Sequence, residues 1–210
     1  MNAVSRTREK QEQAIYEKVV YPGSDVLRNK LGIRSQAELD RAEADVVVIN
    51  EPTRPAFKQF TLAEMKAVHK HLLGDVYDWA GELRTYTTGR NSASFARPEY
   101  IESYYESAIL KPLKAENYLK ASTPEQFAER SAHYACEINA VHPFIDGNGR
   151  TTRILLQDLA LQAGYQLDIR RLEANKGAWY AAMAQGFERG DTTKLQQEIL
   201  NAIIPLGELI

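Results

Sequence analysis

One stretch of the sequence concentrates residue types that bind phosphate and move protons. It runs from His142 to Arg153 and reads HPFIDGNGRTTR. Apolar runs typical of helices flank it, so we expect it to connect two helices. Its glycines permit close backbone approaches that side chains would block. Amides at the start of the second helix would then form an anion site, helped by the positive end of the helix dipole.

The donors in this stretch predict a site for phosphate groups. Gly147 and Gly149 frame backbone amides that would hold phosphate oxygens, and Asn148 adds a donor. Arg150 and Arg153 are three residues apart, so they share one face of the second helix. Arginine guanidinium groups form paired hydrogen bonds that suit phosphate. We therefore expect these residues to bind an anionic partner.

Two further side chains would supply chemistry at the same site. Asp146 is an oxygen ligand of the kind that Mg²⁺ prefers, a single carboxylate with phosphates and waters completing the shell. Histidine side chains titrate near neutral pH, so His142 would accept a proton from an attacking hydroxyl group. The set matches phosphoryl or nucleotidyl transfer, in which positioning and charge neutralisation supply most of the rate.

Other glycine-rich phosphate loops do not fit the stretch. The Walker pattern requires Gly-Lys followed by Ser or Thr, whereas Arg150 follows Gly149 here. The dinucleotide-binding fingerprint requires a third glycine where Thr152 stands, and a preceding strand where the pattern predicts a helix.

The composition is that of an ordinary globular protein, and the length allows one domain or one domain plus a small appendage. The chain has 210 residues, 44% of them hydrophobic, and a formal net charge of -2. This balance disfavours direct binding of nucleic acid through bulk positive charge. The single cysteine, Cys136, excludes an intrachain disulfide and a multi-cysteine metal site. With a polar Met1–Gln13 and no apolar run of membrane-spanning length, we expect no signal peptide, no membrane partner and a cytoplasmic location.

Helix signals dominate the chain. Capping boxes are predicted at Ser35–Glu38, Thr61–Glu64 and Thr123–Gln126. Apolar residues at helical spacing follow two of them, at residues 62–73 and 127–141, and a third apolar run covers 154–163. Segments 83–88 and 92–96 instead indicate two short extended pieces around a turn at 89–91. Helical patterning resumes from Glu99 to about Pro112. We predict an all-α fold with one small β-hairpin.

The chemical stretch resembles the signature of Fic-domain proteins, HPFx(D/E)GNGRxxR, at every defined position. Residues 21–30 also resemble the entry segment of bacterial members, and residues 76–84 resemble the segment leading into their flap hairpin. The resemblance covers residues of about 20–190. It implies a division into an N-terminal helical extension (1–20), a Fic domain (21–190) and a C-terminal helical tail (191–210).

The resemblance implies transfer of AMP from Mg·ATP to a Ser, Thr or Tyr hydroxyl of another protein. His142 would be the general base, Asp146 the Mg²⁺ ligand, and Phe144 a core anchor. The anion hole for the α- and β-phosphates would be formed by Gly147, Asn148 and Gly149. Arg150 and Arg153 would bind the outer phosphates and orient ATP.

The resemblance also implies how the enzyme meets its partners. The hairpin would be a flap that aligns the target by strand-like pairing, with docking residues Thr87, Thr88, Ser94 and Phe95. Family members often carry an inhibitory motif, Ser/Thr-x-x-x-Glu-Gly/Asn, whose Glu pairs with the second motif arginine. The nearest match, Ser5–Glu9, is followed by Lys10, and Gln197 replaces the Glu in the match from Thr193. We therefore expect a toxin inhibited by a small antitoxin that supplies the Glu, with a type II topoisomerase as target.

Two alternative functions remain open at this level. One keeps the fold but transfers the γ-phosphate or another phosphate-bearing group, which the intact motif disfavours. The other is a non-enzymatic phosphate-binding module, against which the joint presence of His142 and Asp146 argues.

Several other residues have alternative interpretations. Trp179 and Tyr180 are core residues or walls of an adenine pocket, and Cys136 is expected in the core. His69 and His71 are two apart on a helix, which disfavours joint metal binding. The apolar segment Ile199–Ile210 docks either on the domain or on a partner.

Overall fold

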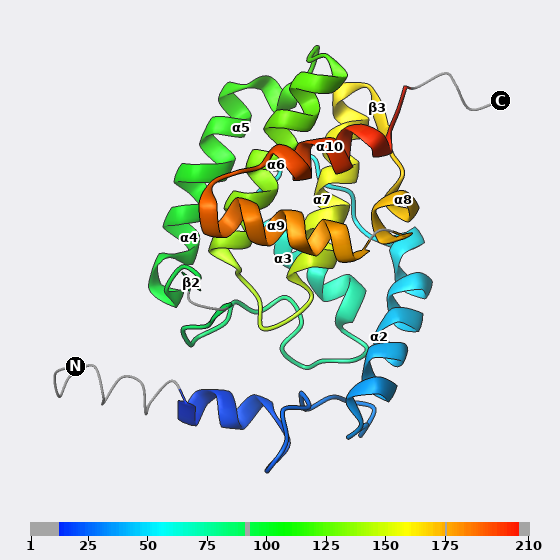
Figure 1. Ribbon diagram of the computed structural model, residues 1–210. Coiled ribbons are helices and arrows are strands. Elements are labelled where there is room, and N and C mark those ends of the chain that lie inside the picture. Colours follow the sequence, from blue (N-terminus) through cyan, green and yellow to red (C-terminus); the bar gives the residue numbers. More distant parts are fainter. Residues whose placement is uncertain (1–12, 91–92, 175, 206–210) are drawn as a thin grey trace, which may run out of the picture.

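The computed structural model describes residues 13–90, 93–174 and 176–205 of the chain. Its centre is formed by two helices, α6 (Pro124–Val141) and α7 (Asn148–Ala163), joined by the loop that carries the chemical stretch. The helix α3 (Leu62–Leu73) packs on α7, and α2 (Gln36–Asn50) packs on α3. The later helices α9 (Lys176–Arg189) and α10 (Thr193–Ala202) lie across α6 (Figure 1). The predicted all-α class is confirmed.

Local sequence signals explain where the central helices begin and end. Thr61 and Thr123 form the predicted capping boxes at the starts of α3 and α6. Gly164 ends α7 in the left-handed conformation. Ser35 precedes α2, but its side chain makes no capping hydrogen bond, so the capping box predicted there is wrong.

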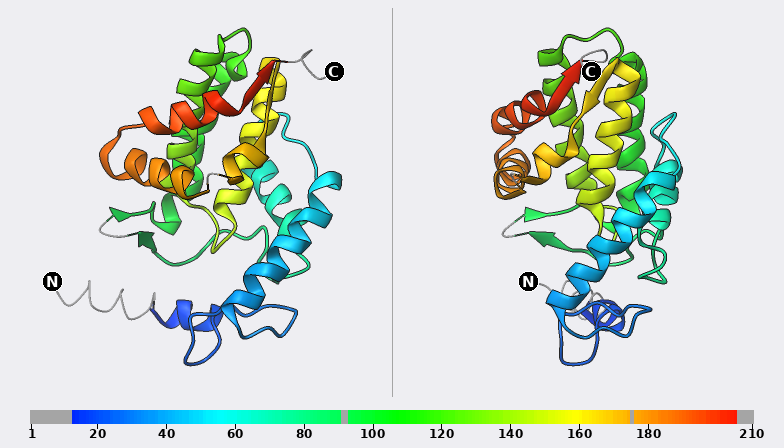
Figure 2. Two further views of the ribbon diagram at one scale, coloured as in Figure 1. Left: turned by 45° about the vertical axis from the view of Figure 1, so that its right-hand side comes forward. Right: turned by 90° about the vertical axis from the view of Figure 1, so that its right-hand side faces the viewer.

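The hairpin is shorter than predicted and shifted along the chain. Its strands are β1 (Gly89–Arg90) and β2 (Ala93–Ser94), with Gly89 opposite Ser94. The turn predicted at residues 89–91 is therefore wrong, because residues 89 and 90 pair as strand. Residues 83–88 contain no strand. In both views of Figure 2 the hairpin lies at the same end of the molecule as the loop between α6 and α7.

The segment after the hairpin is a continuous helical rod with a wide turn in it. A 3₁₀ turn (Pro98–Tyr100) leads into α4 (Ile101–Tyr104), a π-helical turn (Tyr105–Leu110) and α5 (Lys111–Ala115). The helix predicted from Glu99 to about Pro112 is thereby confirmed. The π turn ends directly before α5, whose second residue is Pro112, a residue that cannot donate to the helical ladder. Short 3₁₀ turns also occur at Glu51–Thr53 and Asn117–Leu119.

The end of the described chain packs onto the same core. Strand β3 (Tyr165–Leu167) follows α7, α8 (Ile169–Ala174) precedes α9, and β4 (Ile203–Pro205) follows α10. Strands β3 and β4 pair antiparallel, a second small sheet that the sequence patterns missed. Leu195, Ile199 and Ala202 of α10 belong to the central hydrophobic cluster. Of the two possibilities for Ile199–Ile210, the described part docks on the domain; residues 206–210 lie outside the described residues.

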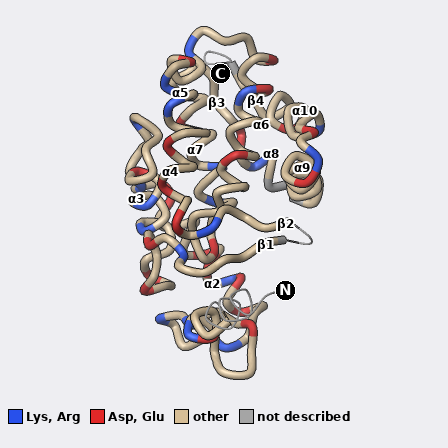
Figure 3. The backbone as a smooth tube through the Cα atoms, turned by 90° about the vertical axis from the view of Figure 1, so that its left-hand side faces the viewer, with Lys and Arg blue, Asp and Glu red and all other residues tan. Residues whose placement is uncertain are grey.

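Charged residues are spread over the described elements. Lys and Arg alternate with Asp and Glu along the tube in Figure 3, as expected for a net charge of -2. Within the described residues, no helix combines the length and the apolar character that a membrane span requires.

Helices α6 and α9 approach each other closely at one glycine. A Cβ atom at Gly186 would lie 2.4 Å from the Sγ atom of Cys136. Cys136 is buried and free, as predicted for a core residue, and burial raises the pKa of its thiol to about 11. The small residue on α9 thus makes room for the sulfur on α6.

We predict an unfavourable coupling between a larger residue at position 186 and the sulfur. Gly186→Ala overpacks the contact, and Cys136→Ala removes the atom that the added carbon would meet. The free energy of unfolding of the double variant should therefore be about 1–3 kcal/mol higher than the sum of the two single effects predicts. Urea unfolding of the four proteins measures this coupling. Gly177→Ala, where no atom lies within 4 Å of the added carbon, is the matched control in α9. Additive single effects would contradict the prediction.

Candidate active site

The loop between α6 and α7 has a left-handed residue at each end. His142 directly follows α6 with φ 44° and ψ 63°, and its N–H donates to the Ile138 carbonyl. Gly147 precedes α7 with φ 77°. A Cβ atom at Gly147 would lie 2.4 Å from Leu73 Cδ1 and 2.9 Å from His69 Nε2, so only glycine fits there. The reversal aims the first amides of α7, which have no intrahelical acceptor, out of the helix start.

Asn148 closes this loop with its side chain. Its Oδ1 accepts a hydrogen bond from the Phe144 N–H (3.0 Å), and its Nδ2 donates to the Phe144 carbonyl (2.9 Å). The residue is only 5% exposed, and Phe144 is fully buried as expected. The amide side chain that was predicted to donate to phosphate is thus engaged within the loop. The backbone N–H of Asn148, at the start of α7, is the group left to serve a ligand.

A buried histidine on α3 contacts the backbone of the loop between α6 and α7. His69 Nδ1 accepts a hydrogen bond from the Gly81 N–H (2.9 Å), so the ring proton lies on Nε2, which donates to the Asp146 carbonyl (2.8 Å). Its ring also stacks on Phe144, with 3.9 Å between the centroids. Burial lowers the pKa of His69 to about 4, which keeps the ring neutral. His69 therefore fixes the peptide that leads into residues 147–149, the predicted anion-binding segment, called the anion loop below.

The imidazole of His142 is oriented by the hairpin. The Phe95 ring lies parallel to it, with 3.8 Å between the centroids and 1° between the planes. Phe95 is 7% exposed and packs on His142, and its predicted part in target docking by strand-like pairing stays a prediction. Thr87 and Thr88 are half-buried and Ser94 is exposed, so these three stay candidates for target docking.

Four of the five predicted phosphate-binding residues line one cavity of about 430 Å³; Asn148 is not among the lining residues. Asp146, Gly147, Gly149, Arg150 and Arg153 form its floor, and α2 forms one wall. The Arg153 guanidinium folds back over the loop, with Nη1 3.6 Å from where a Cβ atom of Gly149 would lie.

Two residues with alternative sequence interpretations differ in their relation to this cavity. Tyr180 of α9 lines the cavity, whereas its neighbour Trp179 is buried in the core. Opposite them, Val47 and Val48 of α2 supply apolar surface. The floor of the cavity is therefore continuous with partly apolar walls.

Arg150 is held by two carboxylates from different parts of the chain. Its Nη2 lies 2.6 Å from Oε2 of Glu43 on α2 and 3.2 Å from Oδ2 of Asp146. The Tyr77 hydroxyl donates to the other oxygen of Glu43. Burial disfavours the charged form of Arg150, but the two carboxylates outweigh it and raise its pKa. The pairing ties α2 to the anion loop.

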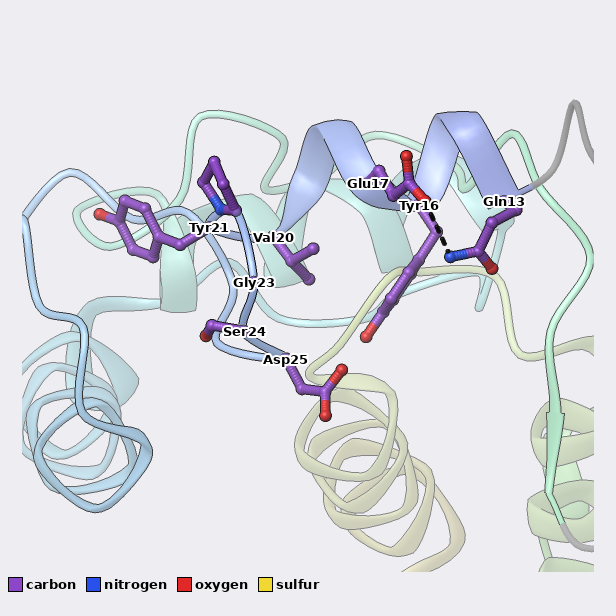
Figure 4. Close-up of a pocket in the computed structure, with 9 residues that line it drawn as sticks. Gln13, Tyr16, Glu17, Val20, Tyr21, Gly23, Ser24 and Asp25 are labelled. Carbon is purple, nitrogen blue, oxygen red and sulfur yellow. Dashed lines mark hydrogen bonds between the residues drawn. The ribbon is translucent and has the colours of Figure 1, made fainter.

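A second cavity, of about 520 Å³, lies at the N-terminal part of the described chain. Residues 13, 16, 17 and 20–25 line it (Figure 4). Gln13 and Glu17 hydrogen-bond to each other at its edge, and the Tyr16 ring meets that of Tyr86 at 5.9 Å. None of the residues from His142 to Arg153 lines this cavity, so it is separate from the candidate active site.

Sequence reasoning missed the support residues Glu43, Tyr77, His69 and Arg84. For two of them a signal was present, since Glu43 follows the buried Leu39 by four positions and His69 lies between Met65 and Leu72 on an apolar helix face. A polar residue on such a face must find a partner. The partner itself lies far away in the sequence, so the pattern does not reveal it. Joint metal binding by His69 and His71 finds no support among the described residues.

We predict that His69→Phe weakens both the fold and nucleotide binding. Phenylalanine keeps the stacking on Phe144 but leaves a buried amide and a buried carbonyl without their partner, at a cost of about 1–3 kcal/mol. Urea unfolding and calorimetric titration with an ATP analogue measure the two effects. His71→Phe is the control, because His71 bonds to Asn50 and Thr53 outside the loop. Unchanged nucleotide affinity in the His69 variant would contradict a role in shaping the loop.

The same variant should change how stability depends on pH. Because the folded pKa of His69 is about 4 and the unfolded value is 6.5, its contribution is complete above pH 6.5 and is lost as the pH falls toward 4. The loss amounts to about 3 kcal/mol in the wild type and should be absent from the pH curve of the phenylalanine variant, so it should appear in the difference between the two curves. Parallel pH curves for both proteins would show that His69 titrates normally.

Known proteins share this arrangement. A model of the Fic/DOC family matches residues 59–160. The "probable protein adenylyltransferase Fic" of Escherichia coli K12 is 36% identical over 192 residues, covering 90% of this chain and 93% of that protein. The protein adenylyltransferase VbhT of Bartonella schoenbuchensis is 40% identical over 155 residues, 72% of this chain and 32% of VbhT.

A solved structure agrees over nearly the whole fold. BepC of Bartonella tribocorum, determined with bound AMPPNP, has a TM-score of 0.81 at 25% identity and covers 90% of this chain and 97% of that chain. The matched family region contains the complete loop from His142 to Arg153, and sequence identity extends well beyond it. The protein therefore belongs to the Fic/DOC family.

Proposed function

We propose that the protein is an adenylyltransferase that moves AMP from ATP to a hydroxyl group of another protein. One observation carries the proposal: the anion loop, Arg150 and Arg153 line a single cavity, and His142 stands at the end of the same loop beside the hairpin. Nucleotide would enter from the cavity, and the target would approach along the hairpin. The relatives named protein adenylyltransferases support this assignment.

The reaction is an in-line attack of the target hydroxyl oxygen on the α-phosphorus of ATP. The new bond is oxygen to phosphorus, and the bond to the bridging oxygen breaks, so pyrophosphate leaves. His142 accepts the proton of the hydroxyl group. Amides at the start of α7 stabilise the charge on the transferred phosphate, while Arg150 and Arg153 bind the outer phosphates.

The residues present fit a magnesium ion. The Asp146 side chain is 47% exposed, lines the cavity and offers a carboxylate, the ligand type that Mg²⁺ takes alongside nucleotide phosphates. When bound, Mg²⁺ neutralises charge on the phosphate oxygens. The ion pair with Glu43 holds Arg150 in place next to the Asp146 carboxylate.

Control by a second protein is part of the proposal. No complete inhibitory motif is found in the sequence, and the match at Ser5–Glu9 lies outside the described residues. A small antitoxin that supplies a glutamate would reach Arg153 through the cavity that nucleotide occupies, and so would compete with productive ATP binding. A type II topoisomerase is the proposed target, approached as a protein and without direct contact to DNA.

The test uses purified protein, cell extract and ATP labelled at either the α- or the γ-phosphate. We expect protein bands labelled only from the α position. His142→Ala should lower the labelling rate by about 10²–10⁴ because the proton acceptor is removed. His133→Ala, in the same helix, is the matched control and should label at the wild-type rate.

The alternatives give different labels. Label from the γ position alone would replace the proposal by kinase-like transfer. If neither label is transferred while an ATP analogue still binds, the protein is a binding module. Labelling by the His142 variant at the wild-type rate would refute the role given to that residue.

A further inference from the structure

A buried arginine directly before the hairpin binds both the hairpin and the backbone of His142. Arg84 is 1% exposed. Its Nε donates to the His142 carbonyl (2.6 Å), and its Nη2 donates to the Val141 carbonyl (3.0 Å). Its backbone N–H donates to the Pro143 carbonyl (2.9 Å). Three consecutive carbonyl groups at the end of α6 are thus held by one residue.

The same guanidinium group reaches the two arms of the hairpin. Nη1 donates to the carbonyl of Tyr86 on the leading arm (2.8 Å), and Nη2 also donates to the carbonyl of Ala96 on the returning arm. The Ala96 N–H in turn donates to the Ala140 carbonyl (2.8 Å). The base of the hairpin is therefore tied to the last turn of α6.

The geometry requires an arginine. The acceptors surround a planar group on several sides, and a guanidinium carries five N–H donors in a fixed fork, whereas an ammonium concentrates its donors on one atom. The carbonyl groups at a helix C-terminus carry partial negative charge, which stabilises a buried cation there. His142 is left-handed, an unfavourable conformation for a residue other than glycine, and holding its carbonyl stabilises that turn.

We propose that Arg84 is a positioning residue that couples the hairpin to His142. This inference rests on the proposed function. The coupling fixes the position of a target hydroxyl group, bound along the hairpin, relative to the imidazole that receives its proton. Phe95 is part of the same connection. Its ring stacks on the His142 imidazole, and the next residue in the chain, Ala96, accepts a hydrogen bond from Arg84. Arg84 does not line the nucleotide cavity. Its effect is therefore on acceptor alignment and not on ATP affinity.

The first test is Arg84→Lys, assayed by labelling of extract proteins with α-labelled ATP and by calorimetry with AMPPNP. We expect transfer to fall by about 10²-fold, the effect of misplacing a reacting group by about 1 Å, while the Kd of AMPPNP stays at the wild-type value. Arg130→Lys is the matched control, because Arg130 also makes a forked pair, with Glu116, away from the loop. It should lose stability but keep its transfer rate per folded molecule.

A double-variant cycle separates positioning from general stability. If Arg84 and Phe95 act on one imidazole, Phe95→Leu should lower transfer in the wild type and change it little in the Arg84→Lys background. Independent losses that multiply, or losses that follow the folded fraction, would overturn the proposal. Weaker AMPPNP binding in the Arg84 variant would also overturn it, by placing the effect at the nucleotide.

Hydrogen exchange of the wild-type protein tests the coupling even if the lysine variant does not fold. The Ala96 and Arg84 amides should share one protection factor, because hairpin base and catalytic loop would open together. Faster exchange at Ala96 than at Arg84 would show a hairpin that opens alone and would refute the coupling. This readout needs no activity. If wild-type protein fails to transfer AMP, the proposed function fails while exchange still decides whether the hairpin and loop move as a unit.

Discussion

The loop between α6 and α7 depends on hydrogen bonds that buried side chains make to its backbone. Arg84 binds the carbonyl groups at residues 141 and 142, His69 binds that of Asp146, and Asn148 binds Phe144 from within the loop. The left-handed conformation of His142 is unfavourable for a residue other than glycine, and these hydrogen bonds stabilise it. The carbonyl groups are held on the inner side, so the amides of α7 are left to face a ligand.

The ion pair between Glu43 and Arg150 gives the nucleotide cavity its second wall. Removing one member of a buried pair leaves an unpaired charge, typically at a cost of about 3–5 kcal/mol. The same arginine that is proposed to bind phosphate therefore also fastens α2 to the core. This dual use explains why α2, which buries only Leu39 and Glu43 completely, keeps a fixed place beside the anion loop.

Much of the fold followed from local signals. Thr61 and Thr123 predict the starts of α3 and α6, and Gly164 predicts the end of α7. These signals are readable because capping and a left-handed glycine act within one helical turn. The first strand of the hairpin was placed several residues too early, since Thr and Tyr at positions 85–88 favour strand but find no partner strand there, whereas the second predicted piece, 92–96, contains β2. The pairing of β3 with β4 was missed because the paired residues are almost forty positions apart and are separated by three helices, so no hairpin turn indicates it.

The sequence alone indicated which residues are proposed to do the chemistry, because HPFIDGNGRTTR places the proposed base, the proposed anion-binding amides and both arginines in one short stretch. Tertiary structure alone decided what holds them in place. Glu43, His69, Arg84 and Phe95 come from separate segments, and although the apolar faces around Glu43 and His69 indicate that these two need partners, no neighbouring residue indicates which partner each one has. A hydrogen bond to a backbone carbonyl leaves no trace in the sequence of the accepting residue. Such support becomes visible only once the chain has folded.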